Sequence, residues 1–172
     1  MKAFLKWVGI TLATVVVAIS LFLFSMRYAD GPMEIISGGP FRSGELAITP
    51  DDWSFLKERD TIEFQTLEPS TSRTTWVASH EGRLFVVSGY MNTNYAKVWK
   101  QWPHYLLEND RIILRVDGKL YEQRLQRIME GPEVVPVLNE FSRKYLGGAE
   151  VTSPAQVTNG DTWMFEVLPR ET

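Results

Sequence analysis

Residues 73–128 read "RTTWVASHEGRLFVVSGYMNTNYAKVWKQWPHYLLENDRIILRVDGKLYEQRLQRI" and hold most of the pattern that decides the fold. Residues 73–79 have the composition of a strand, and the turn "HEGR" leads into a continuous apolar run over residues 84–90. A short continuous apolar run bounded by turn residues indicates a strand that is buried on both faces. The two runs are therefore expected to pair as neighbouring strands.

The clearest hairpin lies at the end of this stretch. Residues 111–116 and 119–128 alternate between apolar and polar side chains, and the dipeptide Asp117-Gly118 separates them. Both residues of a type I′ turn need a positive φ, and Asp-Gly adopts it readily. Two further runs, residues 61–67 and 161–168, have the same strand character. The sequence therefore predicts about six strands.

Two helices are expected to interrupt the strands outside this stretch. The first begins after Thr49, which can serve as its N-cap, with Pro50 at the first helical position. Asp51 and Asp52 then lie near the positive end of the helix dipole. The residues of this helix expected to face the core are Trp53, Leu56 and Phe55.

The second helix is expected within residues 133–148. Pro136 is tolerable only in its first turn, and Gly147 can close its C-terminus. Apolar residues at helical spacing predict a face that packs on the core. These residues are Val134, Leu138, Phe141 and Tyr145. Strands with short helices between them predict a small antiparallel barrel or sandwich with helices at its ends.

Residues 88–105, "SGYMNTNYAKVWKQWPHY", allow two interpretations. They combine aromatic rings, lysines and a polar run, as a ligand-binding loop does. They also read as a connecting helix over residues 95–101 that begins at an N-cap, either Thr93 or Asn94. Both interpretations bury Trp99, so that residue does not separate them.

The N-terminal part of the chain has the character of a transmembrane helix. Residues 7–26 contain no ionisable side chain, and 20 helical residues span the roughly 30 Å hydrocarbon core of a bilayer. Trp7 and Tyr28 stand at the ends, where amphipathic rings prefer the headgroup level. A signal peptide has a shorter apolar region followed by a small-x-small cleavage site, which "SMRYADGPM" does not offer. A buried core helix is the other alternative.

The flanking charges predict the topology of this span. Lys2 and Lys6 precede it and Arg27 follows it, and the basic flank favours the cytoplasm. The protein is therefore expected to be a single-pass protein of the bacterial inner (cell) membrane. Residues 1–29 form the cytoplasmic tip and the transmembrane helix, with residues 7–26 in contact with lipid. Residues 30–172 form one domain on the periplasmic or extracytoplasmic side.

Composition excludes several classes of function. Without the two lysines and the arginine that flank the span, the domain has 15 basic and 21 acidic residues, a formal charge of −6, which disfavours nucleic acid as a partner. With no cysteine and two histidines, a metal site is not expected. The sequence also lacks the Gly-x-Ser-x-Gly, Gly-x-x-x-x-Gly-Lys and Gly-x-Gly-x-x-Gly motifs, which argues against a triad hydrolase, a nucleotide hydrolase and a dinucleotide-binding Rossmann domain.

The order of elements in residues 73–128 resembles the central half of the flavin-binding split-barrel superfamily. This group holds the pyridoxamine-phosphate-oxidase-like and the deazaflavin-dependent nitroreductase-like proteins. The matching pattern is a strand entered by Arg73 and Thr74, a hairpin, a strand that ends in small and polar residues, a short helix bearing Trp99, and a final hairpin around Gly118. The chain departs from the deazaflavin branch at "EPSTSR" and "GYMNTN", where that branch usually has Gly-Arg-Lys-Ser/Thr-Gly-like and Gly-Gly-x-Pro-like turns.

The resemblance implies a mainly β (α+β) fold, a six-stranded split β-barrel with short flanking helices that follows the transmembrane helix. It further implies FMN or a deazaflavin in a groove beside the strands, a small-molecule substrate and a homodimer. The function implied is that of a flavin- or deazaflavin-dependent, nitroreductase-like oxidoreductase; the alternative is a cofactor-free binding or scaffolding module of the cell envelope. The cofactor-binding residues carried over are Arg73, Thr74, Thr75, Gly89, Tyr90, Asn92, Thr93, Lys97 and Lys100. Arg73 is equally suited to pair with a carboxylate such as Glu63 across the strands.

Overall fold

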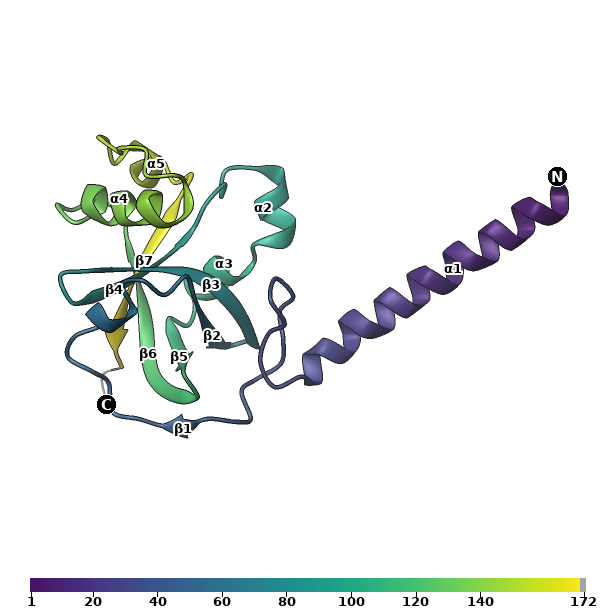
Figure 1. The fold of residues 1–172 in the computed structure, drawn as a ribbon, viewed down its shortest axis with the longest axis horizontal. Coiled ribbons are helices and arrows are strands. Elements are labelled where there is room, and N and C mark those ends of the chain that lie inside the picture. Colours follow the sequence, from purple (N-terminus) through teal and green to yellow (C-terminus); the bar gives the residue numbers. More distant parts are fainter. Residues whose placement is uncertain (171–172) are drawn as a thin grey trace.

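The computed structural model describes residues 1–170, apart from the side chain of Lys97. Six antiparallel strands close into a barrel in the order β6, β5, β2, β3, β4, β7, and β7 pairs back with β6 (Figure 1). The strands are β2 (Thr61–Leu67), β3 (Ser70–His80), β4 (Arg83–Ser88), β5 (Arg111–Val116), β6 (Lys119–Ile128) and β7 (Trp163–Pro169). The chain is thus a six-stranded split β-barrel that follows one long N-terminal helix, which confirms the predicted fold.

Tight turns connect the strands as their sequences predicted. Asp117 and Gly118 have φ angles of 50° and 75°, and Glu81 and Gly82 have φ angles of 50° and 74° between β3 and β4. A seventh strand, β1 (Glu45–Leu46), pairs in parallel with β6. Two residues carry no detectable periodicity, so sequence reasoning did not find it.

The barrel separates two hydrophobic clusters. The inner cluster fills the barrel and includes Phe64, Leu114 and Phe165. The outer cluster lies between the barrel wall and helix α4 (Val134–Tyr145) and includes Phe85 and Met164. The short helix α5 (Ala155–Thr158) adds Val157 to the outer cluster. Alternate side chains of a strand point to opposite faces, so one set of strands supplies both clusters.

Helix α4 has the predicted position and orientation. Val134, Leu138 and Phe141 belong to the outer cluster, and Tyr145 packs against it. Gly147 has a φ of 76°, and the N–H of Gly148 donates to the carbonyl of Ser142 at 2.9 Å. This backbone bond satisfies a carbonyl at the helix C-terminus, as a left-handed cap does.

The helix expected after Thr49 does not form; a short 3₁₀ helix, η2 (Ser54–Leu56), stands there instead. Asp52 accepts a hydrogen bond from the N–H of Ser54 at 2.6 Å, and Thr49 accepts one from Gln123 of β6 at 2.6 Å. Local and tertiary hydrogen bonds thus use the groups that would have capped a longer helix. The core residues were predicted correctly for Trp53 and Leu56, which are buried, but not for Phe55, which is exposed.

Two short helices, α2 (Asn94–Trp99) and α3 (Trp102–Tyr105), connect β4 to β5. The hydroxyl of Thr93 accepts a hydrogen bond from the N–H of Ala96, which confirms the predicted N-cap. The prediction that Trp99 is buried is wrong, since 62% of it is exposed. Trp102 fills the core instead, with its ring 5.1 Å from that of Phe64 and 5.4 Å from that of Phe165. The chain turns between the two helices, and this turn decides which tryptophan faces inward.

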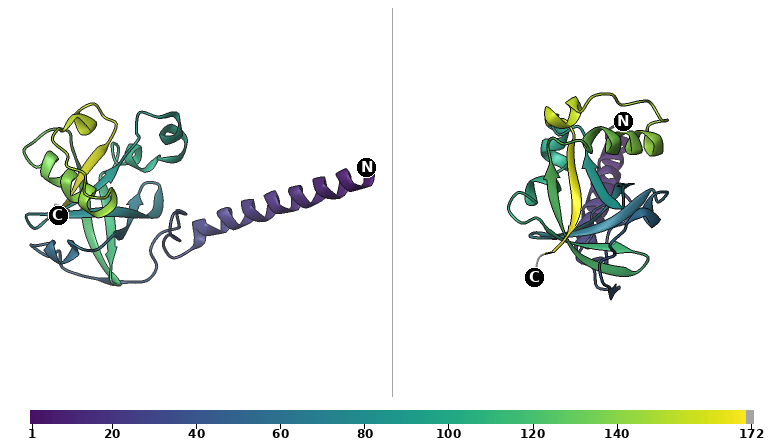
Figure 2. Two further views of the ribbon diagram at one scale, coloured as in Figure 1. Left: turned by 45° about the horizontal axis from the view of Figure 1, so that its top comes forward. Right: turned by 90° about the vertical axis from the view of Figure 1, so that its left-hand side faces the viewer.

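Helix α1 (Lys2–Ser25) projects from the barrel as a separate rod (Figures 1 and 2). None of its residues is buried against the rest of the chain, unlike those of a core helix. With the 3₁₀ helix η1 (Met26–Tyr28), it is long and apolar enough to cross a membrane.

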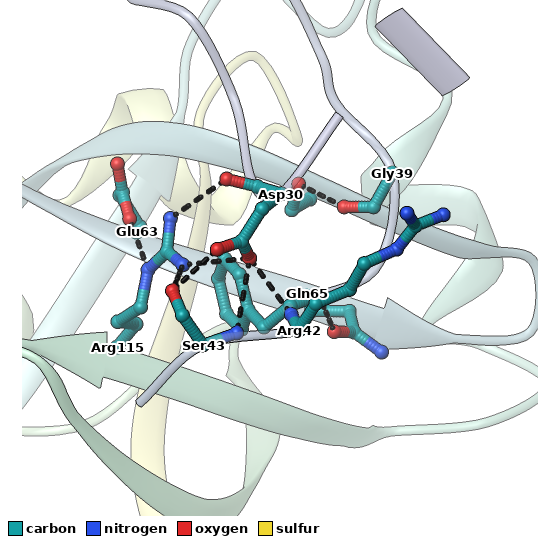
Figure 3. A network of polar contacts seen from close by, with 9 residues as sticks. Asp30, Gly39, Arg42, Ser43, Glu63, Gln65 and Arg115 are labelled. Atoms are coloured by element: carbon teal, nitrogen blue, oxygen red, sulfur yellow. Dashed lines mark hydrogen bonds and ion pairs between the residues drawn. The ribbon is translucent and has the colours of Figure 1, made fainter. Parts of the chain in front are cut away.

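The segment after α1 is held against the barrel by a network of polar contacts (Figure 3). The Asp30 carboxylate accepts hydrogen bonds from the N–H of Arg42 at 2.7 Å and from Ser43. Arg115 of β5 pairs with Asp30 at 3.1 Å and with Glu63 of β2 at 2.7 Å. The hydrogen bond from the Arg42 backbone is the main reason that the pKa of Asp30 is lowered to about 2. The connection between α1 and the barrel is therefore part of the folded domain.

Candidate functional site

A groove of about 650 Å³ lies between β3, the end of β4, and helices α3 and α4. A small hairpin over residues 33–36, closed by a bridge between Met33 and Ile36, contributes to its rim. The hydrophobic wall includes Ile35, Trp76, Trp102, Phe141, Tyr145 and Leu146. Two other surface hollows, of about 570 and 560 Å³, are lined mainly by polar and charged residues. The groove is thus the hydrophobic one of the three.

Two stacked rings form a flat surface in the groove. Trp76 of β3 lies 4.5 Å from the ring of Tyr145 of α4, and the two planes differ by 4°. Trp76 remains 49% exposed. A rigid aromatic plane with an open side suits a flat ring as ligand, because stacking adds to the hydrophobic contact.

Hydrogen bonds to the backbone fix the position of this surface. The Tyr145 hydroxyl accepts a hydrogen bond from the N–H of Val77 at 3.1 Å and lies 2.5 Å from the carbonyl oxygen of Asp60. Burial raises the pKa of Tyr145 to about 12. Lys144 donates to the carbonyl of Val77 at 2.6 Å, and burial lowers its pKa. These contacts tie the end of α4 to β3 and keep the Tyr145 ring in place.

The polar end of the groove is formed by the loop after β4. Lys100 donates to the carbonyl of Gly89 at 2.7 Å, and its ammonium lies 5.5 Å from the centre of the Tyr90 ring. Burial lowers the pKa of Lys100, and the nearby Asp161 acts in the opposite direction. The N–H of Met91 donates to the carbonyl of Asp161 at 2.8 Å, which joins this loop to the one before β7.

Five of the nine predicted cofactor-binding residues line the groove. Those that line the groove are Thr74, Thr75, Gly89, Tyr90 and Lys100. Asn92 and Thr93 do not line it: the Asn92 amide donates to the carbonyl of Asn159 at 3.3 Å, and the Thr93 hydroxyl donates to the carbonyl of Tyr90 at 2.7 Å. The side chain of Lys97 lies outside the described residues.

Arg73 lies in the barrel and not in the groove. Its guanidinium carbon is 5.9 Å from the ring centre of Phe64 and 5.8 Å from that of Trp102, and its Nη2 donates to the hydroxyl of Thr71 at 3.4 Å. Burial lowers the pKa of Arg73 to about 10. Its Nε is buried and has no hydrogen-bond partner among residues 1–170. The alternative in which Arg73 pairs with Glu63 does not hold, because that carboxylate faces away from the barrel interior and binds Arg115.

Sequence reasoning missed the residues that give the groove its character. Trp76 and Tyr145 were assigned to a strand and to a core-packing helix face, and no signal indicated that their rings stack. Glu34 and Ile35 line the groove as well, but they lie far from the other lining residues in the sequence. One signal could have found the ring pair. Trp76 and Tyr145 are aromatic residues at the exposed edges of two elements, β3 and α4, that pack together.

The groove suits an uncharged ring better than a phosphate group. Paired Arg or Lys donors or a helix N-terminus typically hold phosphate. Among the groove-lining residues described, Lys100 is the one cation, and its ammonium already binds Gly89. Glu34 and Asp161 add two carboxylates to the lining. The residues present therefore fit the ring of a flavin or deazaflavin but do not fit the phosphate of FMN.

No family model and no curated protein matches the sequence. Among solved structures, the chain is similar to a conserved hypothetical protein from Mycobacterium tuberculosis, with 14% identity over 73% of this chain and 86% of that one and a TM-score of 0.48. A putative pyridoxamine 5'-phosphate oxidase from Listeria innocua is 11% identical over 69% of this chain and 90% of that one, with a TM-score of 0.43. An F420 reductase is 14% identical over 72% of this chain and 97% of that one, with a TM-score of 0.37.

Proposed function

We propose that the protein is a membrane-anchored split-barrel module that binds a flat, uncharged small molecule in the groove beside β3. The observation that carries the proposal is the half-exposed ring of Trp76, which stacks on Tyr145 and lines a groove of about 650 Å³. The hydrophobic residues of the wall would bury the rest of the ligand. Thr74, Thr75 and Lys100 would supply the few polar contacts that orient it.

A flavin- or deazaflavin-dependent oxidoreductase of the nitroreductase-like kind is the second candidate. One observation favours it: five of the nine residues carried over from the split-barrel resemblance line the same groove. A bound flavin or deazaflavin would supply the hydride chemistry. The residues described here would hold only its ring system, because the groove lacks a cradle for phosphate.

The proposed location follows from α1. A helix of this length and hydropathy suits a single span of the bacterial inner membrane, with residues 30–172 on the extracytoplasmic side, as the flanking charges favour. In this position the module would take its ligand from the extracytoplasmic side or from the membrane. We also propose that the chain forms a homodimer.

A comparison of riboflavin with FMN tests the proposal, because the two share a ring and differ by one phosphate. Binding to the full-length protein in lipid nanodiscs can be followed by the fluorescence of the flavin. We expect riboflavin to bind at least as tightly as FMN, and Trp76→Ala to weaken riboflavin binding by roughly tenfold through lost stacking. Asn92→Ala, a change outside the groove, serves as the control and should leave binding unchanged.

Two results would count against the proposal. FMN binding at least tenfold more tightly than riboflavin would mean that a phosphate site exists and would favour the oxidoreductase. Riboflavin binding that is insensitive to Trp76→Ala, or no binding of either compound, would mean that the groove does not hold this class of ring.

A further inference from the structure

Helix α2 presents its hydrophobic face to the outside of the molecule. Tyr95, Val98 and Trp99 are 60%, 81% and 62% exposed, and their spacing of three and four residues places them on one face of the helix. Ala96 is completely buried. A surface helix of a soluble domain has the opposite arrangement, with its apolar face toward the core. Three large apolar side chains exposed together therefore indicate a surface that meets a partner.

The position of α2 relates this face to the membrane anchor. In Figure 1 and in the left view of Figure 2, α2 lies on the side of the barrel from which α1 leaves. In the same two views the hairpin over residues 33–36 lies between them. It carries Ile35, which is 85% exposed. Strand β1 lies at the bottom of the barrel in Figure 1, away from α2. The network of Asp30 and Arg115 fixes the segment after α1 to the barrel, so this arrangement does not depend on a loose linker.

The composition of this surface suits the boundary between headgroups and acyl chains. Tyrosine and tryptophan prefer that level because their rings are amphipathic. Residues 88–107 contain no Asp or Glu, whereas two lysines and a histidine occur in them. The hairpin over residues 33–36 adds one carboxylate, Glu34, which lines the groove. A stretch that combines aromatic residues with cations and lacks carboxylates is favoured at an anionic lipid surface.

We infer that α2, together with the hairpin over residues 33–36, is a second membrane contact that lies in the interface beside α1. The inference rests on the proposed membrane anchoring and extends it to the ligand. The two contacts adjoin the groove in the chain. Ile35 lies in the hairpin, Tyr90 precedes α2 and Lys100 follows it, and all three line the groove. The groove then opens at the bilayer surface, and its ligand is a flat molecule that partitions into lipid.

Single-cysteine labelling of the full chain tests this inference, because the protein contains no cysteine of its own. Val98→Cys reports on α2, and Leu46→Cys in β1, with a similarly exposed side chain, is the matched control. Val16→Cys in α1 reports on the anchor itself. Each variant carries an environment-sensitive nitrobenzoxadiazole dye and is reconstituted in vesicles of phosphatidylcholine and anionic phosphatidylglycerol, with or without a nitroxide on the acyl chain of the phosphatidylcholine.

We expect the nitroxide lipid to quench the dyes at residues 16 and 98 and to leave the dye at residue 46 bright. Quenching at residue 16 without quenching at residue 98 would overturn the inference and leave the anchor in place. A dye at residue 98 that is blue-shifted but not quenched would mean that a protein partner covers α2, which also overturns it. Absence of quenching at residue 16 would instead refute the membrane anchoring on which the inference rests.

Discussion

Arg73→Met should stabilise the protein, although Arg73 is one of the residues that the split-barrel resemblance assigns to the cofactor. At neutral pH the guanidinium is charged and largely buried, with its pKa lowered to about 10 by desolvation. A pKa this far below the ordinary arginine value means that folding disfavours the charged form by roughly 3 kcal/mol. The cation–π contacts with the rings of Phe64 and Trp102 offset about 1 to 2 kcal/mol of this cost. A methionine keeps the apolar stem in place, so we expect a net gain of about 1 to 2 kcal/mol.

The assay is urea unfolding of residues 26–172, which retain both hydrophobic clusters. Near-UV circular dichroism at neutral pH monitors the unfolding. The matched control is Arg115→Met. Its side chain is 14% exposed and pairs with two carboxylates, so its loss should cost about 2 kcal/mol, between the values for exposed and buried pairs. The two substitutions should therefore change stability in opposite directions. A loss of more than about 1 kcal/mol for Arg73→Met, or stabilisation by added phosphate that depends on Arg73, would refute the reasoning.

Three further predictions concern the core, the helix cap and the segment after α1. Trp102→Ala should cost about 3 to 5 kcal/mol through the cavity it leaves, whereas Trp99→Ala should change the free energy of unfolding by less than about 0.5 kcal/mol; equal costs would contradict the assignment of the core tryptophan. Thr93→Ala should lower the stability in urea by about 1 kcal/mol through the lost N-cap, and Asn94→Ala, its neighbour, should not. The stabilisation by the Asp30 carboxylate should be complete above about pH 4 and should be lost as the pH falls toward its folded pKa of about 2. The difference in urea midpoint between the wild type and Asp30→Asn should therefore shrink between pH 4 and pH 2.5, and a constant difference would contradict this.

The sequence predicted local features correctly where a short segment contains its own physical reason. Asp117 and Gly118 tolerate the positive φ of their turn wherever the hairpin lies. The helix face with Val134, Leu138 and Phe141 is buried because its spacing leaves no other way to remove apolar side chains from water. The uncharged run over residues 7–26 likewise forms a helix without help from the rest of the chain. For these elements, local geometry and hydrophobic periodicity were sufficient.

Other features depend on which distant groups meet, and the sequence did not predict them. Thr49 and Asp52 have side chains that can cap a helix. Thr49 instead accepts a hydrogen bond from Gln123, and Asp52 accepts one from the N–H of Ser54. Trp99 and Trp102 are equally hydrophobic, and the turn between α2 and α3 decides that Trp102 enters the barrel. A single residue can thus satisfy its hydrogen bonds or bury its ring in several ways, and tertiary packing selects one of them.

The sequence by itself determined the six strands, the helix α4, the apolar span and a set of residues that includes one side of the groove. Only the tertiary structure decided that Arg73 lies among rings inside the barrel while Trp76 and Tyr145 form the groove surface. Strand register turns neighbouring residues to opposite faces, so Arg73 and Trp76 separate although they are three positions apart. Tyr145 reaches Trp76 from nearly 70 residues away in the sequence, because α4 packs on the barrel wall. Contacts at such separation follow from the packing of whole elements, which no local pattern records.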